Sequence, residues 1–323
     1  ATHDIACDGV YMAELNKEDQ AKYIGVQGAF YTVAKLVANG GLVALAGMLA
    51  EHLGAIEGSS IDANKGAYSS AWMIIFAVIA AVMVLLGLYH IKMLPSTQVP
   101  ATGKKTTSEI MQDLVNVIGN FFTKKHIVYY IFFIILYRLA EGFIMKVAPL
   151  FLRASREVGG LGLSLTEIGT LNGVFGSAAF VIGSLLGGIF VARYGLKKTL
   201  FMLCCVFNLP FLAYTFLAVV QPTSLYLIGT CITMEYFGFG FGFVGLTLFM
   251  MQQIAPGKHQ MSHYAFASGI MNLGVMLPGM ISGYFSDLLG YRSFFIYVLI
   301  ATIPAFLMTY FIPFTYDDSK KKK

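Results

Sequence analysis

Eight apolar segments, each long enough to cross a lipid bilayer, run along this chain of 323 residues. A membrane-spanning helix needs about 20 mostly apolar residues. The segments lie at about 23–50, 69–94, 126–152, 165–192, 199–220, 224–251, 264–288 and 293–315. Only 12% of the residues are charged, whereas soluble domains carry about 25%. The sequence therefore excludes a soluble globular protein and predicts an all-α polytopic membrane protein with about eight complete transmembrane helices.

The N-terminal residues ATHDIACDGVYMAEL differ from a signal peptide, because they have neither a basic first region nor an apolar core. They predict the end of a further helix.

The lysines and arginines are unevenly distributed between the loops. Of the 22, 15 lie in loops that alternate onto the same side as the C-terminus, 4 lie in the other loops and 3 lie within apolar segments. Because loops rich in Lys and Arg stay in the cytoplasm, we expect a cytoplasmic C-terminus. The net charge of +5 then reflects membrane topology, so we expect no nucleic-acid partner.

The longest hydrophilic connection, at 95–125, divides the chain. We predict the remainder of an N-terminal helical half at 1–94, a cytoplasmic linker at 95–125, a six-helix C-terminal half at 126–316 and a basic cytoplasmic tail at 317–323. From Ser108 the linker has the apolar spacing of an amphipathic helix lying on the membrane surface. A plain solvated linker is an equally good interpretation of the same residues.

A short internal repeat links two of the loops. GIFVARYGLKKTLF begins at Gly188 and GYFSDLLGYRSFF begins at Gly283, and each has a second glycine seven residues later, Gly195 and Gly290. The two loops fall on opposite sides of the predicted topology, which indicates an inverted repeat of the kind found in secondary transporters.

Five ionisable side chains are expected deep in the membrane: Asp4, Lys35, Arg138, Glu141 and Glu235. At about 1.5 Å per residue from the nearest loop they lie ~15 to ~24 Å into a core of ~30 Å. Charged groups at this depth usually face a cavity or a partner rather than lipid. Asp4 and Asp8 are four residues apart, and Arg138 and Glu141 are three apart, so each pair shares a helix face.

The carboxylates are candidate proton carriers. Glu235 has no basic residue in its own segment, and a carboxylate removed from water holds a proton more readily. We therefore expect Glu235 or Glu141 to carry a coupling proton, with Asp4 and Asp8 as further candidates. The alternative is structural, with ion pairs such as Asp4 and Lys35 locking helices together.

Two motifs suggest cofactors that the context does not support. GFGFVG at 240–245 has the spacing of a dinucleotide-binding loop, but such a loop must follow a strand. Gly238, Gly242 and Gly245 instead share one helix face, which predicts close helix packing. His259 and His263 lack a third ligand, so we expect no metal and no cofactor, with a proton gradient as the energy source.

Several segments resemble the AmpG-type muropeptide permeases of the major facilitator superfamily, and the similarity extends over essentially the whole chain. They are ATHDIACDGVYMAEL, YRLAEGFIMKVAPLFL at 137–152, GLSLTEIGTLNG at 162–173, MEYFGFGFGFVGLTLFMM at 234–251 and GYFSDLLGYRSFF. That family has twelve spans. The resemblance therefore implies that residues 1–94 hold the end of helix 4 with helices 5 and 6, and that the first three helices are missing, so that activity is expected only from a longer parent.

The resemblance implies a proton-coupled symporter in the bacterial inner membrane, which imports cell-wall muropeptides such as anhydro-muramyl peptides for peptidoglycan recycling. It places Asp4, Asp8, Arg138, Glu141 and Glu235 at the family's charged positions.

On this interpretation Lys35 and Arg138 attract an anionic group of the substrate, while Tyr137, Tyr236 and Phe237 stack on its sugar rings.

A second resemblance concerns the loop GGIFVARYGLKK, which is similar to the cytoplasmic gate motif of the superfamily. It keeps Gly188, Arg193, Gly195, Lys197 and Lys198. Ala192 stands where the motif usually has an aspartate, so the gating salt bridge of this loop lacks its acid.

Other functions remain open. Members with similar helices move other solutes, which leaves a transporter of acetyl-CoA, a peptide or a sugar as the alternative. An intramembrane enzyme that uses His3, Asp4 and Asp8, and a receptor that does not transport, are further hypotheses. The repeat and the charges on four helices favour a transporter. We expect a monomer in the lipid bilayer that is not an enzyme and acts on a small-molecule substrate by alternating access.

Overall fold

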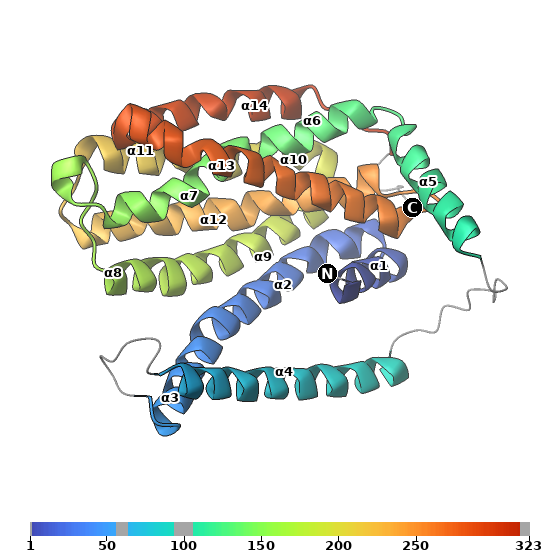
Figure 1. Cartoon of the computed structure of the whole chain (residues 1–323). Helices are drawn as coiled ribbons and strands as arrows, with labels where there is room; N and C mark the ends of the chain where they lie inside the picture. Colours follow the sequence, from blue (N-terminus) through green and yellow to red (C-terminus); the bar gives the residue numbers. More distant parts are fainter. Residues whose placement is uncertain (1, 56–63, 94–105, 317–323) are drawn as a thin grey trace. The chain divides into compact units, whose positions relative to one another are not determined.

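The computed structural model describes residues 2–55, 64–93 and 106–316, and all regular elements within them are helices (Figure 1). This confirms the predicted all-α class. The predicted basic tail at 317–323 and the first part of the predicted linker lie outside the described residues.

The chain forms two compact units, Ala1–Phe30 with Met111–Lys323, and Tyr31–Ile110. The smaller unit holds the end of α2 (Lys17–Leu36), a π-helical turn at Val37–Leu42, α3 (Val43–His52) and α4 (Lys65–Met93). α3 packs against α4, which is strongly apolar and largely exposed. A helix that is apolar on all sides requires burial in protein or lipid. The predicted division at 95–125 stays a prediction.

The larger unit is a bundle of long helices. It contains α1 (Thr2–Glu14), the start of α2, most of α5 (Thr107–Phe122), α6 (Ile127–Tyr137), α7 (Leu139–Arg153), a 3-10 turn (Arg156–Val158), α8 (Leu165–Gly169), a π-helix (Thr170–Gly176), α9 (Ser177–Tyr194), α10 (Leu196–Asn208), α11 (Phe211–Val220), α12 (Leu225–Phe249), a second π-helix (Met250–Ile254), α13 (Gln260–Ala301) and α14 (Ile303–Tyr310).

Six helices in the described part of the chain are long and apolar enough to cross a membrane: Lys65–Met93, Ile127–Arg153, Glu167–Tyr194, Leu196–Val220, Leu225–Ile254 and Gln260–Tyr310. The last has 51 residues and bends at Gly290, so it contains the predicted segment 264–288 and all but the last five residues of the predicted segment 293–315. The predicted segment 23–50 is helical, in α2, the π-helical turn and α3, but it is not among the six.

The glycines of α12 bring it close to α10. A Cβ on Gly238 would lie 2.4 Å from the carbonyl oxygen of Val206, and one on Gly242 would lie 2.4 Å from Cβ of Phe207. Any side chain at these positions would push the helices apart. The predicted close packing through Gly238, Gly242 and Gly245 is therefore confirmed, and no dinucleotide loop forms at 240–245.

The two loops of the internal repeat have the same backbone conformation at matching glycines. Gly195, between α9 and α10, has φ 81° and ψ 146°, and Gly290, within α13, has φ 69° and ψ 158°. Residues with a Cβ rarely adopt this conformation. The agreement supports the predicted repeat, because two helix–turn–helix units make the same sharp turn.

Several loops of the larger unit gather at one end of the bundle, which we call the basic end (Figure 1). They are the connections between α1 and α2, α5 and α6, α9 and α10, and the second π-helix and α13. In or beside these loops lie the basic residues Lys17, Lys124, Lys125, Arg193, Lys197, Lys198 and Lys258. Gln252 donates a hydrogen bond from Nε2 to the carbonyl oxygen of Lys17 over 3.2 Å. Gln253 donates to the carbonyl oxygen of Tyr316 over 2.8 Å and accepts from the backbone N–H groups of Thr315 and Tyr316. Segments far apart in the sequence are thereby joined at this end.

α5 has two different sides. Phe121 is buried, and its ring lies against the rings of His263 and Phe266. Apolar side chains on the rest of the helix are exposed: Met111, Leu114, Val115, Ile118 and Phe122. The predicted helix is confirmed, and its contact with a membrane surface stays a prediction.

Lys124, between α5 and α6, closes the end of the second π-helix. Its Nζ donates to the carbonyl oxygens of Ile254, Ala255 and Pro256, at 3.2 Å for Ala255 and 2.7 Å for Pro256. Carbonyl groups at a helix end lack partners within the helix, so a cation there satisfies them and interacts favourably with the helix dipole. Partial burial lowers the pKa of the Lys124 ammonium to about 8.

Replacing Lys124 with methionine is expected to lower thermal stability, because three carbonyl oxygens lose a donor, at a cost on the order of 1–3 kcal/mol. Since burial holds the folded pKa near 8, below the ordinary 10.5, the unfolded chain binds more protons between these values. The stability of the wild type relative to Lys124→Met should therefore rise with pH across that window. Melting in detergent across this pH range, with the exposed neighbour in Lys125→Met as control, tests this. A pH-independent difference, or an equal loss in the control, would contradict it.

Candidate functional site

A buried ion pair lies where α6 gives way to α7. Arg138 has φ −105° and ψ 4°, which interrupts the helix between Tyr137 and Leu139. Its Nε and one terminal nitrogen donate to the two carboxylate oxygens of Glu141, each over 2.6 Å. Arg138 and Glu141 are only 7% and 6% exposed. The predicted pairing of Arg138 with Glu141 is confirmed, and its two-fold geometry is the strong form of an arginine–carboxylate interaction.

The same turn also contacts α12. The guanidinium carbon of Arg138 lies 5.2 Å from the centre of the Phe243 ring, within the range of a cation–π interaction. The hydroxyl of Tyr137 donates to the carbonyl oxygen of Gly242 over 2.8 Å. Tyr137 is fully buried, so its ring is not available for stacking on a sugar in this conformation.

Glu235 lies on α12 and is partly exposed. Among the described residues its carboxylate has no hydrogen-bond or ion-pair partner, and the negative charge of Glu141 acts on it electrostatically. One carboxylate on α12 is thus unpaired, while the carboxylate on α7 is held by an arginine. A proton can bind to Glu235 without breaking an ion pair.

Two aromatic residues follow Glu235 and are partly exposed. A Cβ on Gly176 would lie 3.0 Å from the Tyr236 ring, so this glycine makes room for the tyrosine. The Phe237 ring is stacked on that of Phe241, with 5.9 Å between centres and 28° between planes. Of the three predicted stacking residues, Tyr236 and Phe237 are the ones with exposed area.

Asn172 was not among the predicted site residues. It lies in the π-helix Thr170–Gly176, and its Oδ1 is buried without a hydrogen-bond partner. A buried amide oxygen usually has a partner, and π-helical turns are frequent at functional sites. The signal available in the sequence was a lone asparagine within an apolar segment.

The acidic pair of α1 is described in part. The side chains of His3 and Asp4 lie outside the described residues. Asp8 accepts a hydrogen bond at Oδ1 from Nε2 of Gln27 over 2.8 Å, which joins α1 to α2.

Lys35 belongs to the smaller unit. Its side chain is exposed, and its Nζ lies 5.5 Å from the centre of the Tyr31 ring one turn earlier in α2. Its predicted role toward an anionic substrate stays a prediction.

The predicted gate residues have different surroundings. Gly188 faces α2, where a Cβ would lie 2.8 Å from the carbonyl oxygen of Ala21. Gly25 faces α9, where a Cβ would lie 2.3 Å from the carbonyl oxygen of Ser184. Helices α2 and α9 therefore cross in close contact at the basic end.

The remaining gate residues surround the turn after α9. Gly195 ends the helix, and the guanidinium carbon of Arg193 lies 5.6 Å from the Tyr194 ring centre. Lys197 and Lys198 are exposed at the start of α10. The gating role of these residues stays a prediction.

Comparison with known sequences gives a family match. The sequence profile of the Major Facilitator Superfamily matches residues 9–254. The chain is 23% identical over 197 residues to an anhydromuropeptide permease of Escherichia coli, covering 61% of this chain and 39% of the permease. It is 24% identical over 220 residues to a Rickettsia conorii protein named putative transporter AmpG 1, covering 68% and 50% of the two chains.

A second Rickettsia conorii protein, named putative transporter AmpG 4, is 23% identical over 313 residues, covering 96% of this chain and 69% of the relative. The chain spans about two fifths to one half of the length of the first two relatives. The resemblance to AmpG-type proteins is confirmed.

Proposed function

This chain belongs to the Major Facilitator Superfamily, a family of transporters rather than enzymes, and we propose that it takes part in proton-coupled import of cell-wall muropeptides by alternating access. It is a multi-pass membrane protein. We place it in the bacterial inner membrane with a cytoplasmic C-terminus, because basic loops stay on the cytoplasmic side.

The observation that carries the proposal is the contrast between two carboxylates. Glu141 is neutralised by Arg138 through two hydrogen bonds, whereas Glu235 lacks a partner among the described residues and lies within electrostatic range of Glu141. A coupling group must take up and release its proton in each cycle. Glu235 does this without separating an ion pair, so we assign it the proton and assign Glu141 to the anchoring of Arg138.

Contacts between helices at the basic end suggest how alternating access could work. The α2–α9 crossing at Gly25 and Gly188, and the hydrogen bond from Gln252 to Lys17, hold helices together there. If this end faces the cytoplasm, the conformation is closed on the cytoplasmic side. Release of substrate inward would then require the crossing to open, which fits rocking of two halves about a central site.

The substrate assignment rests on the names of the relatives and on the chemistry of the site. An anhydromuropeptide combines sugar rings with peptide carboxylates. Arg138 would attract a carboxylate, while Tyr236 and Phe237 offer partly exposed rings for a sugar.

Uptake of radiolabelled anhydromuropeptide into membrane vesicles tests the proposal. The protein is expressed from its complete gene, and a pH gradient, acidic outside, is imposed. We expect accumulation above the external concentration that collapses when a protonophore is added. Accumulation that persists with the protonophore would overturn proton coupling. Absence of uptake, combined with gradient-driven uptake of acetyl-CoA, a free peptide or a free sugar, would overturn the substrate assignment.

A further inference from the structure

A buried histidine connects α5 to the start of α13 at the basic end (Figure 1). His263, in the first turn of α13, is only 2% exposed. One of its ring nitrogens, Nε2, lies 3.2 Å from the carbonyl oxygen of Val117 in α5. Its ring centre lies 5.6 Å from that of Phe121, one turn further along α5. A single side chain of α13 thus makes both a polar and an aromatic contact with α5.

These contacts fix the protonation state of the ring. A carbonyl oxygen can only accept a hydrogen bond, so Nε2 of His263 carries the hydrogen. Nδ1 is buried, and it has no hydrogen-bond partner in the described part of the chain. Protonation would add an N–H group at Nδ1 that has no acceptor, together with a positive charge away from water. The docked position of α5 therefore fits the neutral imidazole and not the imidazolium ion.

The charged groups nearest to His263 oppose a further positive charge. The Lys124 ammonium, just after α5, acts electrostatically on the ring. So does His259, whose ring centre lies 5.8 Å away and which becomes a second cation in acid. On α5, Asp113 lies one turn before Val117, but it is exposed, so water and salt screen its charge. An imidazolium ion at this position would thus be repelled by its neighbours.

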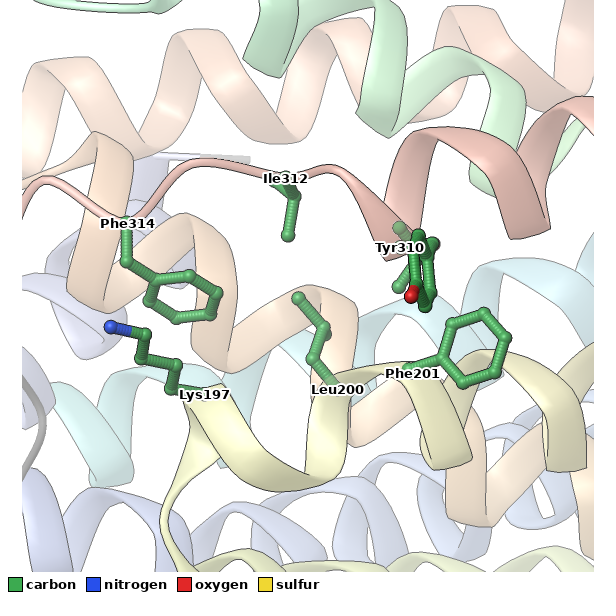
Figure 2. Close-up of a pocket in the computed structure, with 7 residues that line it drawn as sticks. Lys197, Leu200, Phe201, Tyr310, Ile312 and Phe314 are labelled. Atoms are coloured by element: carbon green, nitrogen blue, oxygen red, sulfur yellow. The ribbon is translucent and has the colours of Figure 1, made fainter.

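Other charged groups at the basic end face other elements. α1 approaches α13 at Met261, whose side chain would touch a Cβ on Gly9. Residues two positions apart in a helix point about 200° apart, so α1 and its acids meet α13 on the side away from His263. Lys197, at the start of α10, faces the segment after α14, and Figure 2 shows it beside Phe314. These groups therefore belong to other contacts.

We propose that His263 is a pH-dependent latch, which holds α5 on α13 in its neutral form and releases α5 when it is protonated. Release brings Nδ1 into contact with water, which accepts the hydrogen bond of the added proton. The released state binds more protons than the docked state, so acid favours release and a neutral or alkaline pH favours docking. The chain passes from the smaller unit to α6 through α5, so the latch controls how firmly this connection is held. The proposal does not depend on proton coupling at Glu235 or on the identity of the transported substrate.

Hydrogen–deuterium exchange at pH 7.5 and pH 5.5 tests this on the purified protein, expressed from its complete gene. A released α5 of 16 residues is only marginally helical, so its amides exchange. An exposed histidine takes up its proton near pH 6.5, which favours the released state about tenfold at pH 5.5. After correction for the intrinsic pH dependence of exchange, we expect exchange in α5 to rise about tenfold between the two pH values, while exchange in α7 stays unchanged.

His263→Gln is the decisive variant, because its amide can still donate to the carbonyl oxygen of Val117 but does not titrate. Its α5 should remain protected at both pH values. His126→Gln is the control, since His126 is an exposed histidine between α5 and α6, and it should respond to pH as the wild type does. An equal rise in the wild type and in His263→Gln would overturn the proposal. If His263→Gln does not fold, the wild type decides alone, because an α5 equally protected at both pH values would also overturn the proposal.

Discussion

Replacing Glu235 with glutamine is expected to abolish uptake driven by a pH gradient while the protein remains folded. Glutamine has nearly the same shape but cannot release a proton. With one proton coupled to each substrate, a gradient of one pH unit supplies about 1.4 kcal/mol and supports about tenfold accumulation. Glu235→Gln should lose this accumulation and bring the substrate only to equal concentrations on both sides, in the vesicle assay with labelled anhydromuropeptide.

Glu157→Gln is the matched control, because Glu157 is exposed in the 3-10 turn after α7. It should transport as the wild type does. Full gradient-driven accumulation by Glu235→Gln, or an equal loss in Glu157→Gln, would show that Glu235 does not carry the proton.

The second large effect is expected on stability, from the buried pair. Arg138→Met leaves the Glu141 carboxylate buried without its partner, and loss of one member of a buried pair costs about 3–5 kcal/mol. The double variant Arg138→Met with Glu141→Met removes both charges and should recover most of that loss. Thermal melting in detergent measures both, with Arg292→Met, which changes an exposed arginine, as control.

Measuring transport by the double variant distinguishes a structural role of the Arg138–Glu141 pair from a role in substrate binding. If the pair binds substrate, the double variant should be stable and inactive. A double variant that recovers stability and also transports at the wild-type rate would assign the pair a purely structural role. An Arg138→Met variant as stable as the control would contradict the buried-pair account itself.

Much of the fold followed from spacing in the sequence. The helical class, the close contact of α12 with α10 through Gly238 and Gly242, and the pairing of Arg138 with Glu141 depend on periods of three, four and seven residues, which a helix fixes locally. Gly195 and Gly290 have similar backbone dihedral angles, as their matching positions in the repeat suggested.

Other features depend on how the helices rotate and pack, which spacing does not determine. Tyr137 was expected to face a substrate, but rotation of α6 buries its ring and directs its hydroxyl to Gly242. Asn172 was not predicted, because a neutral amide in an apolar segment is not a distinctive signal in the sequence. It stands out only in the structure, where its Oδ1 is buried without a hydrogen-bond partner. In the sequence Lys124 is one basic loop residue among many, and only the packing of the helices shows that it satisfies the end of a helix 130 positions away.

The central claim is that the movement of substrate and the movement of a proton are one process that depends on Glu235. The most direct measurement is the external pH of weakly buffered vesicles, without an imposed gradient, when anhydromuropeptide is added outside. We expect the medium to become alkaline with the wild type, as protons enter with substrate, and to remain unchanged with Glu235→Gln. Substrate uptake by the wild type without any change in external pH would contradict the account.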